Sequence, residues 1–280
     1  MIKIENFSFQ GINGAYSELA GRNIFPEADS LACSTFEEMF QTVREGKANV
    51  AIVPIENSQA GRVADTQRLI PDSDLKIIKE YFLEIKHNLL VVPGTKMSDI
   101  KRIYSHEQGI AQCRKKIIEL NKEMIIVADT AGAAKKITEL NSKEDAAVAS
   151  ELASRIYNLE ILESNFQDAS TNVTRFLVMA SKLYPIDTND ENLITTLVFK
   201  VRSIPASLYK CLGGFASNGV NITKLESYIH PQGFDVAQFY IDFEGHPEQK
   251  SVKFALEEMK FFCKHMNILG VYKKSEFRKK

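Results

Sequence analysis

The sequence has few of the residues that mark specialised protein classes. It contains no tryptophan and only four cysteines, which are scattered at Cys33, Cys113, Cys211 and Cys263. These cysteines show neither the spacing of metal ligands nor the pattern of a disulfide framework. We therefore expect free thiols, buried where they fall on apolar helix faces, in a reducing, cytoplasmic environment.

An excess of one charge and long apolar runs are also missing. The 35 basic residues (Lys and Arg) nearly balance 36 acidic ones, for a net charge of −1. This balance gives no whole-molecule field that would favour nucleic acid or an anionic membrane. Residues 1–5 do not begin a signal peptide, and no stretch approaches the ~20 apolar residues of a membrane span. We therefore expect no nucleic-acid or membrane partner, and any anionic ligand must be held by local groups.

The first part of the chain alternates between strand-like and helix-like segments. With 44% hydrophobic residues, the 280-residue chain has enough apolar material for two domains. The strand-like runs of the first part are 2–9, 50–53, 103–104, 125–127, 146–149 and 173–180. Helix-like segments between them predict an α/β fold with mostly parallel strands over residues 1–181.

A second pattern follows the polar stretch 181–192. Its order is strand, helix, strand, strand, helix, strand, at residues 193–201, 206–216, 222–229, 234–243, 249–263 and 267–272. This βαββαβ order is typical of a ferredoxin-like domain, which we place at residues 193–273.

Five polar turns follow strand-like runs and are candidates for a ligand site. They are residues 10–17, 54–61, 105–108, 129–134 and 171–176. In a parallel sheet such turns gather at one edge, where helix N-termini present free N–H groups to an anion. Taken singly, Ser105, Asp129 and Thr130 are more simply read as helix caps.

The last of these turns places Thr174, Arg175 and Phe176 at or inside an apolar strand. A buried arginine is costly unless it meets a carboxylate. That carboxylate could belong to a ligand or to a structural ion pair, and the sequence leaves both open.

Taken together, the five turns resemble the prephenate dehydratase family, in order over residues 4–180. The matching segments are 11–17, 54–61, 105–108 with Gln112-Cys113, 129–134 and 172–176. Glu107 stands where the family has proline, outside the expected chemistry. The resemblance implies a two-lobed catalytic domain like type 2 periplasmic binding proteins. It also implies conversion of prephenate to phenylpyruvate, carbon dioxide and water. Formation of the aromatic ring drives this reaction, so it requires no metal or organic cofactor.

The resemblance also assigns catalytic roles. Thr174 resembles the family's essential threonine and would donate a hydrogen bond to the departing hydroxyl. Arg175 would hold the pyruvyl carboxylate, because tight binding of the ring carboxylate would stabilise the ground state of a group that loses its charge. Phe176 would belong to an apolar wall facing the ring carboxylate.

The remaining expected site residues position the substrate. They are Gln10, Glu56, Asn57, Ser58, Ser105, His106 and Thr130. Of these, Glu56 and His106 are also candidates for relaying a proton to the departing oxygen.

The C-terminal part resembles an ACT domain over roughly residues 193–272, through segments 205–210 and 219–227. The implied L-phenylalanine site comprises Ala206, Ser207, Leu208, Asn221, Ile222, Glu226 and Ser227. Ala206 and Tyr228-Ile229 depart from the family's glycine and Arg-Pro, so the sequence leaves the response to phenylalanine open. The exposed edge and face of a βαββαβ sheet predict a homodimer or homotetramer.

Two alternatives to a prephenate dehydratase remain. The substrate could be arogenate, which differs by an amino group in place of the keto group. The α/β part could instead be a non-catalytic sensor of an amino acid or keto acid. Formation of phenylpyruvate from prephenate would exclude the sensor.

Overall fold

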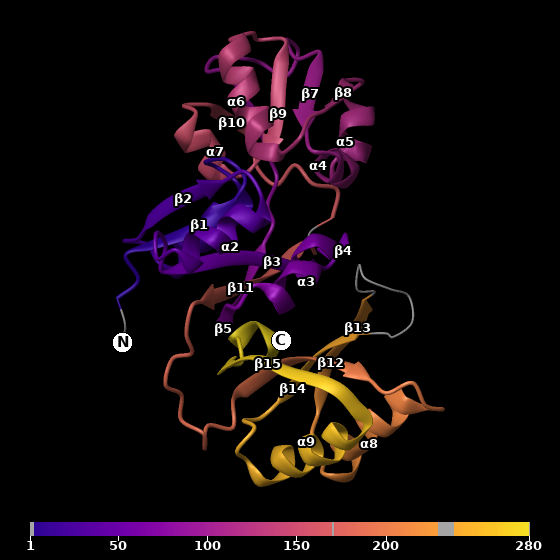
Figure 1. Cartoon of the computed structure of the whole chain (residues 1–280). Coiled ribbons are helices and arrows are strands. Elements are labelled where there is room, and N and C mark those ends of the chain that lie inside the picture. The colour runs from indigo at the N-terminus through magenta and orange to yellow at the C-terminus, as the bar shows by residue number, and fades with distance from the viewer. Residues whose placement is uncertain (1–2, 170, 229–237, 280) are drawn as a thin grey trace. The chain divides into compact units, whose positions relative to one another are not determined.

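The computed structural model describes residues 3–169, 171–228 and 238–279 (Figure 1). Its contacts divide the chain into two compact units. The first unit comprises Met1–Val63 and Tyr81–Phe176, and the second comprises Ala64–Glu80 and Leu177–Lys280. The boundary expected from the sequence assigned residues 64–80 to the first domain, whereas this segment belongs with the second unit.

Two sheets form the first unit, as expected for a two-lobed α/β domain. The strands and helices of the first lobe are β1 (Asn6–Gln10), α1 (Tyr16–Ile24), β2 (Asp29–Cys33), α2 (Phe36–Arg44), β3 (Val50–Asn57), β4 (Gly61–Arg62) and the start of β11 (Val173–Ala180). The strand order is β11-β3-β1-β2, and β1 is parallel to both β2 and β3. Residues 50–53 are fully buried, which explains their unbroken apolar run.

The second lobe is built on a separate five-stranded sheet. Its elements are β6 (Asn88–Val91), β7 (Arg102–Ser105), α4 (Glu107–Gln112), α5 (Arg114–Glu119), β8 (Glu123–Ile126), α6 (Thr130–Leu140), β9 (Asp145–Ala149), α7 (Glu151–Ile156) and β10 (Glu160–Glu163). The order is β10-β6-β9-β7-β8, with β7 parallel to β8 and β9 and with β6 antiparallel to β9 and β10. Residues 85–87 connect the two lobes, and the described residues 164–169 and 171–172 belong to the return connection.

In the second unit the expected βαββαβ order is confirmed. Its elements are α3 (Ala64–Leu69), η1 (Ile70–Asp72), the start of β5 (Lys76–Glu84), β12 (Leu193–Val201), α8 (Ser207–Ser217), β13 (Ile222–Tyr228), β14 (Gln238–Glu244), α9 (Lys250–Phe262), β15 (Cys263–Lys273) and η2 (Glu276–Lys279). The strand order β13-β14-β12-β15 is antiparallel throughout. Parts of the expected strands 222–229 and 234–243 lie outside the described residues.

Helices α8 and α9 cover one face of this antiparallel sheet (Figure 1). The core between the helices and the sheet includes Phe199, Phe215, Phe243 and Met259. No helix in the described part of the chain is long and apolar enough to span a bilayer.

Candidate active site

Asn57 and Thr174 meet where strand β3 lies beside β11. The Asn57 side-chain nitrogen Nδ2 donates to Thr174 Oγ1 at 2.9 Å and to Asn172 Oδ1 at 2.7 Å. The Asn57 oxygen Oδ1 accepts from the backbone N–H groups of Gln59 and Ala60, at 2.9 and 2.8 Å. The tight turn after β3 therefore fixes which end of the Asn57 amide faces Thr174.

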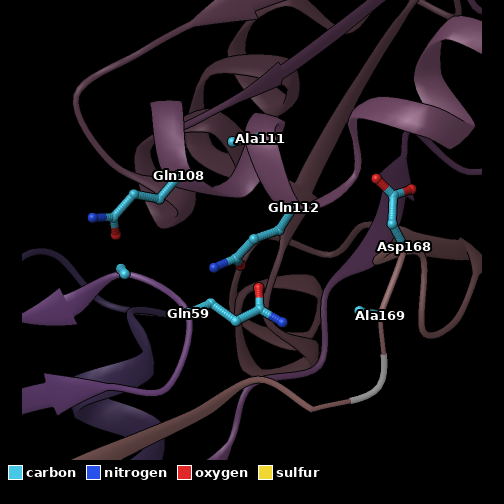
Figure 2. Close-up of a pocket in the computed structure, with 7 residues that line it drawn as sticks. Gln59, Gln108, Ala111, Gln112, Asp168 and Ala169 are labelled. Carbon is cyan, nitrogen blue, oxygen red and sulfur yellow. The ribbon is translucent and has the colours of Figure 1, made fainter.

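A cavity of about 390 Å³ opens beside this pair of strands. Its lining residues are Gln59, Ala60, Gln108, Ala111, Gln112, Asp168 and Ala169. Gln112 and Gln59 point toward one another across it (Figure 2). The volume is within the range of small-metabolite sites, roughly 300–1,000 Å³.

Gln112 links this cavity to Thr174. Its Oε1 accepts from Asn172 Nδ2 at 2.8 Å, and Asn172 in turn accepts from Asn57. Asn172 is 1% exposed and Thr174 9% exposed. The amides thus form a nearly dry path from the cavity lining to the threonine hydroxyl.

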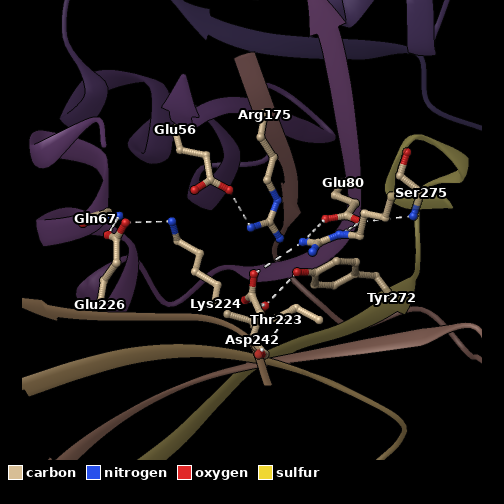
Figure 3. Close-up of polar contacts among 12 residues, drawn as sticks. Glu56, Gln67, Glu80, Arg175, Thr223, Lys224, Glu226, Asp242, Tyr272 and Ser275 are labelled. Atoms are coloured by element: carbon tan, nitrogen blue, oxygen red, sulfur yellow. Dashed lines mark hydrogen bonds and ion pairs between the residues drawn. The ribbon is translucent and has the colours of Figure 1, made fainter. Parts of the chain in front are cut away.

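Arg175 faces away from Thr174, because successive side chains of a strand point to opposite sides. Its Nη1 lies 3.0 Å from Glu56 Oε1, and its guanidinium carbon lies 6.0 Å from the centre of the Phe82 ring. Figure 3 shows the Arg175 contact with Glu56. Arg175 is 1% exposed. In the structure Arg175 therefore meets the carboxylate of Glu56, whereas the sequence led us to expect the pyruvyl carboxylate of the substrate as its partner.

Phe176 and Ser58 make contacts that stabilise the fold. Phe176 is 1% exposed and belongs to the buried core. The Ser58 hydroxyl donates to the Thr171 carbonyl at 2.9 Å and accepts from the Val173 N–H at 3.0 Å. Ser58 therefore joins the turn after β3 to the start of β11.

The expected site residues of the second lobe mostly lie at the starts of its helices or in its core. Fully buried Ser105 donates to the Val148 carbonyl at 2.7 Å. His106 caps α4, with its Nδ1 accepting from the Gln108 N–H. Thr130 is the first residue of α6, whose cap is Asp129. In the first lobe, Gln10 is half-buried at the end of β1.

The network also contains residues that were not predicted as site residues. They are Tyr16, His87, Gln112 and Asn172. Two signals were available in the sequence. Gln108 and Gln112 are four residues apart on one helix and so share a face. Asn172 is two residues from Thr174 in a strand and so points the same way. Tyr16 lies in the candidate turn 10–17 but was not singled out there, and nothing local indicates His87.

The expected effector residues lie on two elements of the second unit. Ala206 has a left-handed φ of 57° just before α8, and Ser207 and Leu208 begin that helix. Asn221 precedes strand β13, which carries Ile222, Glu226 and Ser227. The Glu226 carboxylate accepts from Lys224 Nζ at 2.8 Å and from the Gln67 amide of α3 (Figure 3).

Among the described residues, no three His, Cys, Asp or Glu side chains are grouped to hold a metal ion.

Comparison with known proteins identifies the family. The sequence profile described as "Prephenate dehydratase" matches residues 7–183. A bifunctional N-acyl-homoserine lactone acylase/prephenate dehydratase of Komagataeibacter europaeus is 44% identical, covering 98% of this chain and 97% of the relative. Arogenate dehydratase 2 of Petunia hybrida is 36% identical, covering 95% of this chain and 71% of the relative.

Solved structures support the same family assignment. A quorum-quenching acylase has a TM-score of 0.93 and 43% identity, covering 98% of this chain and 100% of that structure. Prephenate dehydratase from Arthrobacter aurescens in complex with L-Phe has a TM-score of 0.86 and 30% identity, covering 96% of this chain and 90% of that one. The chain belongs to the prephenate dehydratase family.

Proposed function

We propose that this chain converts prephenate to phenylpyruvate, carbon dioxide and water. The observation that carries the proposal is the hydrogen bond from Asn57 to Thr174 Oγ1. Because the threonine oxygen accepts this bond, its own proton can be donated to another oxygen. The departing hydroxyl of prephenate needs such a donor, and Thr174 is joined to the lining of a metabolite-sized cavity through the amides of Asn57, Asn172 and Gln112.

The reaction needs a hydrogen-bond donor at the oxygen of the departing hydroxyl. The bond from the ring to its carboxylate breaks, and its electron pair completes the aromatic ring as the carbon–hydroxyl bond breaks. Carbon dioxide leaves at one end of the ring, and hydroxide leaves at the other and takes a proton to become water. Donation by Thr174 stabilises the negative charge that grows on that oxygen. A positioned proton donor typically contributes ~10²–10⁴-fold to the rate.

Glu56 and Arg175 support the same pair of strands from the opposite face. Glu56 precedes Asn57 in β3, and Arg175 follows Thr174 in β11, so the ion pair and the Asn57–Thr174 bond join adjacent positions. Binding of the pyruvyl carboxylate by Arg175 would require this ion pair to open. We therefore propose that Arg175 positions Thr174 through Glu56, while the polar lining of the cavity, including Gln59 and Gln112, receives the substrate.

The test compares wild-type protein with Thr174→Val, which keeps the shape of the side chain and removes the hydroxyl. With prephenate, the wild type should produce phenylpyruvate, and Thr174→Val should lower kcat by roughly 10²–10⁴-fold with a smaller change in KM. Thr174→Ser is the matched control and should retain most of the turnover. Wild-type turnover in Thr174→Val would contradict the role given to this hydroxyl.

The same assay with arogenate, at equal concentration, decides between the two substrates. Phenylpyruvate from prephenate and phenylalanine from arogenate are separate products. The relative named as an arogenate dehydratase makes this comparison necessary. Absence of both products would favour the non-catalytic sensor.

A second candidate activity comes from the relative named as both an acylase and a prephenate dehydratase, which matches almost the whole chain. Release of a fatty acid and homoserine lactone from an N-acyl-homoserine lactone would establish it. Measurement in Thr174→Val then shows whether the two activities share this residue.

We further propose that the βαββαβ part is an ACT domain that binds L-phenylalanine and pairs with a second copy in a homodimer or homotetramer. The element order and the L-Phe complex of the Arthrobacter aurescens protein support this proposal. Gel filtration with and without L-phenylalanine tests the assembly, and a monomer in both conditions would contradict it.

A further inference from the structure

His87 is a buried histidine between the two lobes of the first unit, in the connection from β5 to β6. It is 3% exposed. Its Nδ1 lies 2.8 Å from the hydroxyl of Tyr16 in α1, and its Nε2 lies 2.7 Å from Oε1 of Gln112 in α4. The rings of His87 and Tyr16 meet edge to face with their centroids 5.6 Å apart. The histidine thus joins a helix of the first lobe to a helix of the second.

From Gln112 a continuous series of hydrogen bonds leads to Thr174. Gln112 Oε1 also accepts from Asn172 Nδ2 at 2.8 Å. Asn172 Oδ1 accepts from Asn57 Nδ2 at 2.7 Å, and the same Asn57 nitrogen donates to Thr174 Oγ1 at 2.9 Å. The network therefore runs from Tyr16 through four side chains to the proposed donor.

The direction of every bond in this series is fixed at one end by the backbone. The N–H groups of Gln59 and Ala60 can only donate, so the Asn57 atom that they meet must be its oxygen. The Asn57 nitrogen then faces Asn172 and Thr174 and gives one proton to each. Since Asn172 accepts from Asn57 through its oxygen, its nitrogen must donate to Gln112.

The same reasoning fixes the tautomer of His87. Gln112 meets His87 through an amide oxygen, which can only accept, so the proton of the neutral ring must be on Nε2. Burial lowers the pKa of the His87 ring, which favours the neutral form. Its Nδ1 then has a lone pair that faces the Tyr16 hydroxyl, whose proton is shared with the carbonyl oxygen of Lys86 at 3.0 Å. Burial raises the pKa of that hydroxyl well above its ordinary value, so it keeps its proton.

We propose that His87 and Tyr16 are positioning residues for the reaction. Tyr16 holds the ring of His87 in place, and His87 holds the amide of Gln112 and, through it, that of Asn172 beside Asn57, whose nitrogen occupies the Thr174 oxygen and leaves the threonine proton to the substrate. This inference rests on the proposed dehydratase function. Without the Nε2–H donor, the Gln112 amide can rotate, and Asn172 loses the acceptor that holds its side chain beside Asn57 and Thr174.

Two substitutions of His87 separate positioning from packing. The side-chain nitrogen of a glutamine can reach the place of Nε2, whereas that of an asparagine reaches only the place of Nδ1. We expect His87→Asn to lower kcat for prephenate by on the order of tenfold, with KM within about threefold of wild type. His87→Gln should keep most of the turnover, because it still offers Gln112 a donor.

A third variant, Tyr16→Phe, removes the hydroxyl that holds the His87 ring at Nδ1 and should also lower kcat more than it raises KM. Its matched control is Tyr157→Phe, which removes a hydroxyl that donates to the carbonyl of Asn13 at 2.8 Å, in the same turn before α1. That control should keep wild-type kcat. The melting temperature of each variant shows whether its fold is retained.

The outcomes are distinct. If His87→Asn and Tyr16→Phe keep wild-type turnover, the proposal is overturned. Equal losses of kcat in His87→Asn and His87→Gln, with equal losses of thermal stability, also overturn it, because they indicate packing alone. A wild-type protein that is inactive toward both prephenate and arogenate would instead remove the proposed function on which the inference depends.

Discussion

The buried pair of Arg175 and Glu56 can be tested apart from the chemistry. Arg175 is almost fully buried, so the loss of the Glu56 charge weakens the compensation of a guanidinium that water solvates poorly. Glu56→Gln should therefore lower the free energy of unfolding by about 1–3 kcal/mol, and Glu56→Gln with Arg175→Gln should recover part of that loss. Denaturant unfolding of the single and double variants provides the measurement.

The kinetics of Arg175→Gln distinguish the two partners considered for this arginine. If Arg175 positions the strands, stability and kcat should fall together while KM changes little. If Arg175 binds the substrate carboxylate, KM should rise strongly while the variant keeps wild-type stability. Glu56 would then not be the partner of Arg175 during the reaction.

Residue-scale features were predictable only where they depend on local sequence. The turn after β3 and the polar start of β11 made Asn57 and Thr174 site candidates, because they follow or begin apolar runs, and the family resemblance supplied the role of Thr174. The alternation of a strand already implied that Thr174 and Arg175 face opposite sides. The contact of His87 with Tyr16, 71 residues away, depends instead on the packing of the two lobes of the first unit. No local sequence pattern predicts this packing.

At the scale of elements, strand β15 approaches β5 so closely that only glycine fits. A Cβ added at Gly270 would lie 2.1 Å from the backbone carbonyl oxygen of Ile77. Backbone atoms of a paired strand cannot move aside easily, so Gly270→Ala should lower the free energy of unfolding by about 1–3 kcal/mol. Gly213→Ala in α8 is the control, because a Cβ there meets nothing within 4 Å. It should instead stabilise the helix by about 0.5–1 kcal/mol. Equal thermal stability of the Gly270 variant and wild type would contradict the tight approach.

The βαββαβ order could be predicted because each of its elements has its own apolar period. The grouping of residues 64–80 with the second unit could not be predicted in this way. Their helix and strand look like a continuation of the first domain, and only long-range contacts group them with the second unit. One such contact is the ion pair of Glu80 in β5 with Arg278 of η2, at 2.7 Å, which fixes the C-terminal segment to this strand.

At the scale of the whole molecule, the proposed effector should stabilise the folded protein. A ligand that binds only the native state adds RT ln(1 + [L]/Kd), or about 2.7 kcal/mol at a hundred times its Kd. L-phenylalanine should therefore raise the melting temperature in a concentration-dependent way, while D-phenylalanine should not. The amino group of the effector needs an anionic partner, and the Glu226 carboxylate, now held by Gln67 and Lys224, is our candidate.

Glu226→Gln should abolish the stabilisation by L-phenylalanine, because it removes the charge that the ammonium group requires. Glu257→Gln, on the exposed face of α9, is the matched control and should leave the stabilisation unchanged. If wild-type protein shows no shift even at millimolar L-phenylalanine, the departures at Ala206 and Tyr228 have removed the effector site. If both variants respond as wild type does, Glu226 is not its anionic partner. Because Glu226 also holds Gln67 of α3, ligand capture of this carboxylate would compete with that contact, so the Gln67→Ala variant should bind L-phenylalanine more tightly than wild type.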